Sequence, residues 1–285
     1  MRLCRFDNDR LGIVEGEHVL DVTVALDVIP PSNYPLPTHD LLIANLEQVC
    51  ARASQLAPGA ERKPISQVKL LSPVANPGKL VAAPVNYLKH LEEARADSGI
   101  HHNSQIIEIQ RIGLFLKATS SLIGPGEPVA LRHLDRRNDH EIELAIVIGK
   151  SGTRIQKDQA WNYIAAYTIG LDMTVRGPEE RSLRKSVDSF SVLGPWLVTA
   201  DEIDDATSLD FELSVNGETR QKANTRDLVL GIPELIEYAS SFYSLHPGDV
   251  IYTGTPEGVG PVQPGDVITA EFEKIGRMEV SVTSA

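Results

Sequence analysis

The chain has 285 residues, of which 42% are hydrophobic and 23% charged, and its formal net charge is −12. These proportions are typical of a folded globular protein, and the acidic balance argues against a nucleic-acid or anionic-membrane partner. No run approaches the roughly 20 apolar residues of a membrane span, and the charged N-terminus does not match a signal peptide, so we expect a cytoplasmic protein.

The first part of the chain predicts a small α+β domain. Short β-like runs at residues 11–14 and 18–22 precede one helical pattern near residues 39–56. The only cysteines, Cys4 and Cys50, are too few for a disulfide framework and match no metal motif, so we expect inert thiols. We place the N-terminal domain at residues 1–70.

The remainder, residues 71–285, predicts a β-rich α+β domain. Residues 58–64 are polar and rich in proline and glycine, as a linker would be. Most of the sequence beyond this linker consists of short strand patterns with Pro-Gly turns, interrupted by helical patterns at about 157–166 and 231–242. We expect a mixed β-sandwich or roll.

Two carboxylates stand at the start of the apolar run at residues 139–149. Glu141 and Glu143 are two residues apart, so on a strand they share one face with Cα atoms roughly 6.5 Å apart. Such close acids are unfavourable unless they are solvated or bind a cation, and Mg²⁺ prefers oxygen ligands. The pair predicts half of a metal site; the alternative is an exposed strand end.

A third acid lies at a useful interval along the chain. Asp172 ends a strand pattern 29 residues after Glu143, which is the length of a strand, a connecting helix and a returning strand. Three carboxylates and water molecules satisfy octahedral Mg²⁺ or Mn²⁺ and leave positions for a chelating substrate. Spacing alone leaves open whether Asp172 is a ligand or a turn residue.

The chain resembles the fumarylacetoacetate hydrolase superfamily. The resemblance rests on four blocks in the same order, at residues 138–149, 170–176, 185–190 with 193–196, and 247–260. It implies a β-rich roll of mixed sheets, a homodimer and an acylpyruvate hydrolase-like activity. It also implies that Glu141, Glu143 and Asp172 bind the divalent cation.

The same resemblance gives a role to the pattern N-Y-x-x-H-x-x-E at residues 86–93. His90 and Glu93 are three residues apart, so on a helix they share a face, and the carboxylate can orient the imidazole as a general base. In the family this pattern belongs to a lid helix that supplies the water-activating pair. The alternative is a surface helix with a local contact. The residues before it, Ala83-Pro84-Val85, depart from the commoner glycine-bearing sequence.

Basic and backbone donors complete the expected site. Lys185 matches a family lysine whose ammonium would stabilise developing negative charge, although a solvent-facing lysine is the alternative. Thr255 and the backbone of Gly254 could hold a substrate carboxylate, or form a plain turn. Arg176 and Lys117 lie in family-like blocks and are further candidates for substrate binding, or support the fold.

Two regions receive a weaker interpretation. We interpret residues 94–111 as a loop after the lid, with a role in substrate selection left open. The adjacent His101 and His102 within it point in different directions and are poorly placed to chelate one ion. Asp188 is expected to order Lys185 or the adjoining loop.

We therefore expect a hydrolase that cleaves a 2,4-dioxo acid to pyruvate and a carboxylic acid. The cation would polarise the 2-oxo carbonyl and stabilise the enolate, and His90 would activate water. Fumarylpyruvate and maleylpyruvate are reasonable substrates, but the acyl group and the native metal stay open. The alternatives are a 2-hydroxy-dienoate isomerase, an oxaloacetate decarboxylase and, less expected, a silent metal-binding scaffold.

Overall fold

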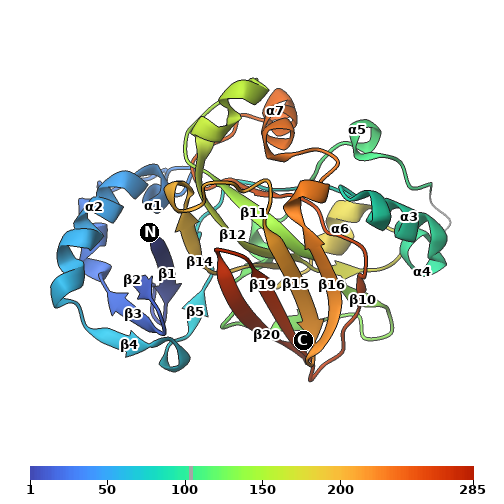
Figure 1. Cartoon of the computed structure of the whole chain (residues 1–285), viewed down its shortest axis with the longest axis horizontal. Coiled ribbons are helices and arrows are strands. Elements are labelled where there is room, and N and C mark those ends of the chain that lie inside the picture. Colours follow the sequence, from blue (N-terminus) through green and yellow to red (C-terminus); the bar gives the residue numbers. More distant parts are fainter. Residues whose placement is uncertain (103–104) are drawn as a thin grey trace.

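The computed structural model describes residues 1–102 and 105–285, in which strands form three sheets and seven α-helices surround them (Figure 1). The largest sheet has 12 strands. Ten of them lie in the order β4 (Arg62–Pro64), β3 (His18–Asp21), β2 (Arg10–Glu15), β1 (Arg2–Phe6), β14 (Ser191–Thr199), β12 (Ile164–Asp172), β11 (Ile142–Ile148), β17 (Val250–Tyr252), β6 (Leu80–Ala82) and β7 (Phe115–Lys117). The others are β5 (Leu70–Leu71), paired with β1, and β8 (Leu122–Ile123), paired with β14.

Two smaller sheets complete the strand structure. A five-stranded sheet has the order β16 (Glu218–Asn224), β15 (Asp210–Val215), β19 (Val267–Phe272), β20 (Gly276–Ser284) and β9 (Val129–Leu131). A three-stranded sheet has the order β13 (Thr174–Val175), β10 (Asn138–His140) and β18 (Gly260–Pro261). The described helices are α1 (Leu41–Ala44), α2 (Leu46–Leu56), α3 (Leu88–Ala96), α4 (Ser98–His101), α5 (Ile109–Ile112), α6 (Arg181–Lys185) and α7 (Ile232–Phe242).

Strand β11 has a core on each of its two faces. Ile142 and Ile146 belong to a core shared with Phe272 of the five-stranded sheet. Ala145 and Val147 belong to a second core, which includes residues of α1 and α2. The alternation predicted for this strand is therefore confirmed, and the large sheet lies between the N-terminal helices and the C-terminal sheet. The expected β-rich sandwich is confirmed, and the continuous apolar sequence of β11 reflects burial on both sides.

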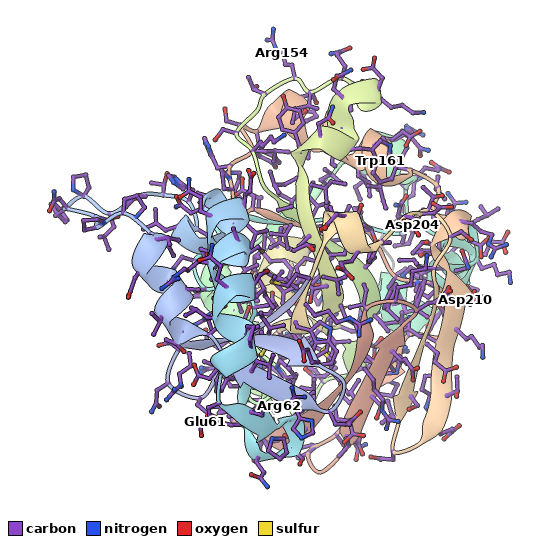
Figure 2. The ribbon with its side chains drawn as sticks, turned by 60° about the vertical axis from the view of Figure 1, so that its left-hand side comes forward. Glu61, Arg62, Arg154, Trp161, Asp204 and Asp210 are labelled. Carbon is purple, nitrogen blue, oxygen red and sulfur yellow. The ribbon has the colours of Figure 1, made fainter. Side chains whose placement is uncertain are left out.

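The N-terminal strands continue the large sheet. Strand β1 pairs with β14 through Arg2 opposite Val198 and Leu3 opposite Leu197. Figure 2 shows Arg154 at one end of the molecule and Glu61 and Arg62 near the other, where β4 closes the N-terminal edge of the sheet. A domain boundary near residue 70 stays a prediction, since strands from both sides of it share one sheet.

Two local predictions are wrong. The helix expected at residues 157–166 is a 3₁₀ helix, Lys157–Tyr163, and strand β12 begins directly after it. It buries only Ala160, which is too little for an amphipathic α-helix, and the residues of β12 are rich in strand-favouring types. The described part of the segment 94–111, expected to be a loop, contains the end of α3, all of α4 and the start of α5, while residues 103 and 104 lie outside the described residues.

The other helical predictions are confirmed. The pattern near residues 39–56 forms α1 and α2, and the pattern at 231–242 forms α7. Within the described ranges, no helix combines the length and the apolar character needed to cross a bilayer.

Candidate active site

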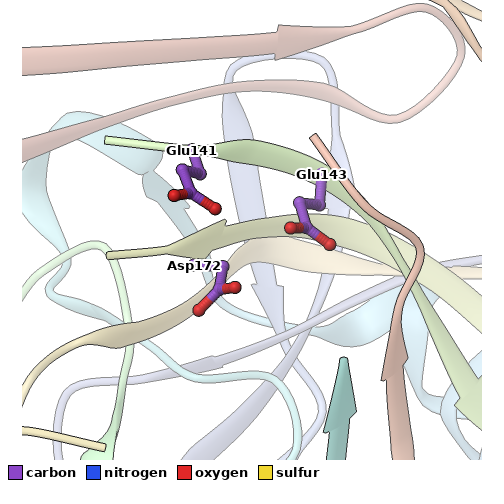
Figure 3. A group of neighbouring side chains, drawn as sticks. All are labelled: Glu141, Glu143 and Asp172. Atoms are coloured by element: carbon purple, nitrogen blue, oxygen red, sulfur yellow. The ribbon is translucent and has the colours of Figure 1, made fainter. Parts of the chain in front are cut away.

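Three buried carboxylates converge where β10 and β11 meet the end of β12. The two longer strands are antiparallel, with Ile142 opposite Leu171, and the Asp172 amide donates to the Glu141 carbonyl at 2.9 Å. Glu141, Glu143 and Asp172 each offer an oxygen within 4.8 Å of the others (Figure 3). Their side chains come from adjacent strands, so the register of the sheet brings the third acid to the first two.

Three cations contact two of these acids. Lys185 Nζ lies 2.7 Å from Glu141 Oε2 and 2.6 Å from Asp172 Oδ2. Lys117 Nζ contacts Asp172 Oδ1 and donates to the Phe190 carbonyl. Arg176 Nη2 donates to Glu141 Oε1 at 2.9 Å. Because all three cations are buried, these contacts compensate charges that would otherwise be costly to desolvate.

Glu143 has a different environment from the other two acids. The Gly254 amide donates to its Oε2 at 2.6 Å, and no described lysine or arginine lies within ion-pair distance. Burial, followed by the negative charge of Asp172, raises the pKa of Glu143 well above its usual value. Burial opposes ionisation of Glu141 too, but there Lys185 and Arg176 outweigh it and lower the pKa.

This donor set fits a hard divalent cation. Carboxylate oxygens are the ligands that Mg²⁺ and Mn²⁺ prefer, and an added cation would favour the ionised form of Glu143, which burial and Asp172 oppose. The lysines contact only Glu141 and Asp172, so the charge of Lys185 favours ionisation of Glu143 from a distance and does not outweigh burial. The structure therefore brings the three predicted ligands together in a site where Glu143 has no cation in direct contact among the described residues.

His90 and Glu93 lie on one face of α3, as the spacing predicts. His90 Nδ1 lies 2.8 Å from Glu93 Oε2, and the other carboxylate oxygen accepts a hydrogen bond from the Gly258 amide at 3.0 Å. His90 is buried and lines the same pocket as the three acids. Both oxygens of the Glu93 carboxylate are thus hydrogen-bonded, and this carboxylate orients the imidazole ring of His90.

The residues before α3, Ala83-Pro84-Val85, include a strained backbone conformation. Val85 has φ = +44°, a left-handed conformation that is strained for a β-branched residue and that glycine adopts freely. The next residue holds the strained turn in place, since Asn86 Nδ2 donates to the carbonyls of Leu230 and Thr253.

Thr255 and Gly254 make structural contacts in addition to facing the pocket. Thr255 Oγ1 donates to the Ile142 carbonyl at 2.9 Å and accepts from Gln221 Nε2 at 2.8 Å. The Gly254 amide is directed to Glu143. Thr255 lines the pocket, so a substrate contact there stays a prediction. Asp188 contacts Arg132 at the surface and not Lys185, so the first of its two expected roles is wrong, while ordering of the adjoining loop stays a prediction.

Comparison with known proteins identifies the family. The model of the fumarylacetoacetate (FAA) hydrolase C-terminal family matches residues 79–283. The chain belongs to the fumarylacetoacetate hydrolase family. The resemblance drawn from the four sequence blocks is thereby confirmed, and the match includes every residue of the candidate site.

Three relatives within this family are informative. A maleylpyruvate hydrolase of Aquipseudomonas alcaligenes is 59% identical over 286 residues, covering 100% of both chains. The crystal structure of a maleylpyruvate hydrolase from Sphingobium sp. SYK-6, in complex with manganese(II) and pyruvate, has a TM-score of 0.85 and 42% identity, with 100% of both chains covered. A mitochondrial oxaloacetate tautomerase of Xenopus laevis is 36% identical, over 97% of this chain and 88% of the relative.

The pocket that the three acids and His90 line also contains residues that were not predicted from the sequence of this fumarylacetoacetate hydrolase family member. Arg181, Arg184 and Phe115 line it, together with apolar side chains of α3, of α4 and of the segment after them, namely Ala94, Ile100 and Ile106. A signal for the arginines was present, because residues 181, 184 and 185 have the spacing that places three basic side chains on one helical face. Phe115 gave no such signal, since its position depends on a distant strand.

Proposed function

We propose that the chain is a divalent-metal-dependent hydrolase that cleaves an acylpyruvate of the maleylpyruvate type to pyruvate and a carboxylic acid. The observation that carries this proposal is the His90–Glu93 pair, 2.8 Å apart and in the same pocket as the three acids. The relative that is 59% identical over the whole chain is a maleylpyruvate hydrolase, which supports the choice of substrate.

In this proposal Glu141, Glu143 and Asp172 hold the cation. The solved relative contains manganese(II) and pyruvate, which supports Mn²⁺ and a 2-oxo acid at this position; Mg²⁺ uses the same ligands. When bound, the cation supplies Lewis acidity toward the oxygens of the 2-oxo acid. Lys185 and Arg176 keep positive charge beside Glu141, which reduces the repulsion that an anionic substrate would meet.

The hydrolytic step uses the imidazole of His90. Because Glu93 occupies the Nδ1 side, Nε2 is the nitrogen that can take a proton from water. The oxygen of that water bonds to C4 of the 2,4-dioxo acid, and the bond between C3 and C4 breaks. The electron pair left on C3 is delocalised onto the 2-oxo oxygen, and C3 then takes a proton to give pyruvate, while C4 leaves as a carboxylic acid.

The proposal is tested by the substitution His90→Ala. We expect kcat for maleylpyruvate to fall by about 10²- to 10⁴-fold, the usual contribution of a general base. The Mn²⁺ affinity, measured by calorimetry, should stay within about twofold of the wild-type value, because His90 is not a proposed metal ligand. Loss of a group that binds or orients the metal would lower the affinity much more. Lys89→Ala is the matched control, since Lys89 is on the same helix and its side chain is 77% exposed. Unchanged turnover in the His90 variant would remove this residue from the chemistry.

Two other activities of the same site serve as comparisons. Isomerisation of a 2-hydroxy-dienoate and decarboxylation of oxaloacetate need no water attack at a second carbonyl, so the oriented His90–Glu93 pair favours hydrolysis over both. Turnover should be measured on acylpyruvates, oxaloacetate and dienoates with Mn²⁺ and with Mg²⁺. Absence of activity on all of them would support a silent metal-binding scaffold.

Two further expectations complete the proposal. The family resemblance implies a homodimer, which sedimentation analysis of the purified protein would test. We also propose a cytoplasmic location.

A further inference from the structure

Arg181 is a cation of the pocket that the mechanism above does not use. It is the first residue of α6, it is half-buried, and it lines the pocket together with the three acids. Its guanidinium carbon lies 5.5 Å from the centre of the Phe115 ring, and Lys185 Nζ lies 5.6 Å from the same centre. The guanidinium and the ammonium therefore share one aromatic wall, one helical turn apart.

The guanidinium of Arg181 has donors that are not committed. No hydrogen bond or ion pair joins it to any residue within 1–102 and 105–285. Burial is the main influence on its pKa and lowers it, as expected for a cation without a direct anionic partner. A partly desolvated cation of this kind is unfavourable unless an anion completes it.

The other cations of the pocket differ from Arg181 in this respect. Lys185, Lys117 and Arg176 each contact a buried carboxylate. Arg184 Nε donates to the Glu179 carbonyl at 2.8 Å and its Nη1 to the Val175 carbonyl at 3.4 Å. Arg181 is thus the arginine of the pocket whose fork of donors is available to a ligand.

We propose that Arg181 binds the carboxylate at the acyl end of the substrate and thereby selects acylpyruvates whose acyl group is anionic. This inference rests on the proposed function, and it names the residue that distinguishes a dicarboxylic substrate from a neutral one. The guanidinium fork matches a carboxylate in two parallel hydrogen bonds, which an ammonium cannot reproduce. In this proposal the pyruvyl end lies at the three acids and the acyl end is directed to the wall of α6 and Phe115, where Arg181 lines the pocket.

The experiment compares two substrates in the metal-loaded enzyme. Maleylpyruvate carries a carboxylate on its acyl group, and acetylpyruvate carries a neutral methyl group there. In Arg181→Gln, kcat/KM for maleylpyruvate should fall at least tenfold more than kcat/KM for acetylpyruvate, mainly through KM. Arg181→Lys should retain part of the difference, because it keeps the charge without the fork. Equal losses on the two substrates, or no loss, would overturn the inference.

A control and a binding measurement separate this inference from the proposed function. The control is Leu183→Gln. Leu183 lies on the same helix, its side chain is 66% exposed, and it does not line the pocket, so this variant shows whether damage to α6 alone lowers activity. Maleate binding is measured by calorimetry on the wild type and on Arg181→Gln, and the wild type should bind at least tenfold more tightly. A wild-type enzyme that hydrolyses neither acylpyruvate would refute the proposed function, while equal maleate affinities would refute the role of Arg181.

Discussion

Asp97 accepts a hydrogen bond of 2.8 Å from Arg137, and this contact joins the end of the helix that carries His90 to the strand beside the buried acids. Arg137 Nε also donates to Asp139 at 2.7 Å, and Asp139 accepts a second bond from Arg176 at 2.8 Å. Since Arg176 in turn contacts Glu141, an unbroken series of charged contacts connects the end of α3, the expected lid helix, with the carboxylate site.

The substitution Asp97→Asn tests whether this series positions the lid. Asparagine keeps the acceptor for the Gly99 amide in the first turn of α4 but removes the charge that Arg137 binds. The pair is partly exposed, so its loss should cost less than about 1 kcal/mol in the free energy of unfolding and up to about fivefold in kcat/KM. Urea denaturation and steady-state kinetics measure the two effects.

The control for this prediction removes a similar pair elsewhere. Asp188 pairs with Arg132 at the surface, and both side chains are more than half exposed. Asp188→Asn should therefore leave kcat/KM unchanged while it alters stability as little as the Asp97 variant does. If both variants lose the same activity, the Asp97 contact has no special relation to the lid.

The charge of Asp97 also gives a pH dependence. The hydrogen bond from Arg137 is the main reason why the pKa of Asp97 is lower than usual. A carboxyl whose folded pKa is lowered contributes stability above its unfolded pKa and loses that contribution as the pH falls through the folded pKa. In Arg137→Gln the pKa should return toward about 3.9, the ordinary value for aspartate. Carbon-detected NMR titration of the Asp97 carboxyl checks this; an unchanged pKa would show that Arg137 is not the cause.

Local patterns were sufficient to predict the strand that carries the acids. Alternation in residues 142–148 placed two sets of side chains on opposite faces, and the structure has a separate core on each. The returning strand was predicted and pairs with β11, but the connecting helix is a 3₁₀ helix and not the expected amphipathic α-helix. Over a short segment, hydrophobic periodicity does not distinguish a 3₁₀ helix from an α-helix. Which of the two forms depends on how many of its residues tertiary packing buries.

Sequence spacing found the members of the site that are close in the chain, and it missed contacts between distant segments. Glu141 with Glu143, and His90 with Glu93, could be paired by strand and helix geometry. Lys117 was a candidate, yet its partner Asp172 is 55 positions away, and spacing carries no information about such a pair. Arg181 belongs to a basic helical pattern with Arg184 and Lys185, but its place on the pocket wall beside Phe115 depends on a strand far away in the sequence.

The orienting role of Glu93 predicts a strong effect for Glu93→Gln. Glutamine retains an acceptor for the Gly258 amide but turns an NH₂ group toward His90 Nδ1. The neutral ring would then carry its proton on Nε2, which is the nitrogen that must accept the proton from water. We expect kcat to fall by about 10²- to 10⁴-fold. Glu92→Gln is the matched control, since Glu92 is exposed on the same helix, and similar losses in both variants would exclude a specific role for Glu93.

The three acids should differ in what they contribute to the metal-free protein. In Glu143→Gln, a group whose pKa is raised by burial is replaced by a neutral side chain of the same shape, so the free energy of unfolding near pH 5 should change by less than about 1 kcal/mol. Because the folded pKa of Glu143 exceeds the unfolded one, the metal-free wild type loses stability as the pH rises above about 4.3, and the variant does not. Thermal unfolding in a chelator across this pH range measures the difference.

Asp172→Asn should behave in the opposite way. Asp172 is the carboxylate that Lys117 contacts, and it is one of two carboxylates that Lys185 contacts. Its replacement leaves the buried Lys117 ammonium without a carboxylate partner and leaves Lys185 with Glu141 alone. Removing one partner of a buried pair typically costs roughly 3–5 kcal/mol. Both variants should lose Mn²⁺ affinity, so calorimetric titration with Mn²⁺ alone cannot tell them apart, whereas unfolding of the metal-free proteins can. Equal stabilities for the two variants would mean that the lysines do not depend on Asp172 for their charge balance.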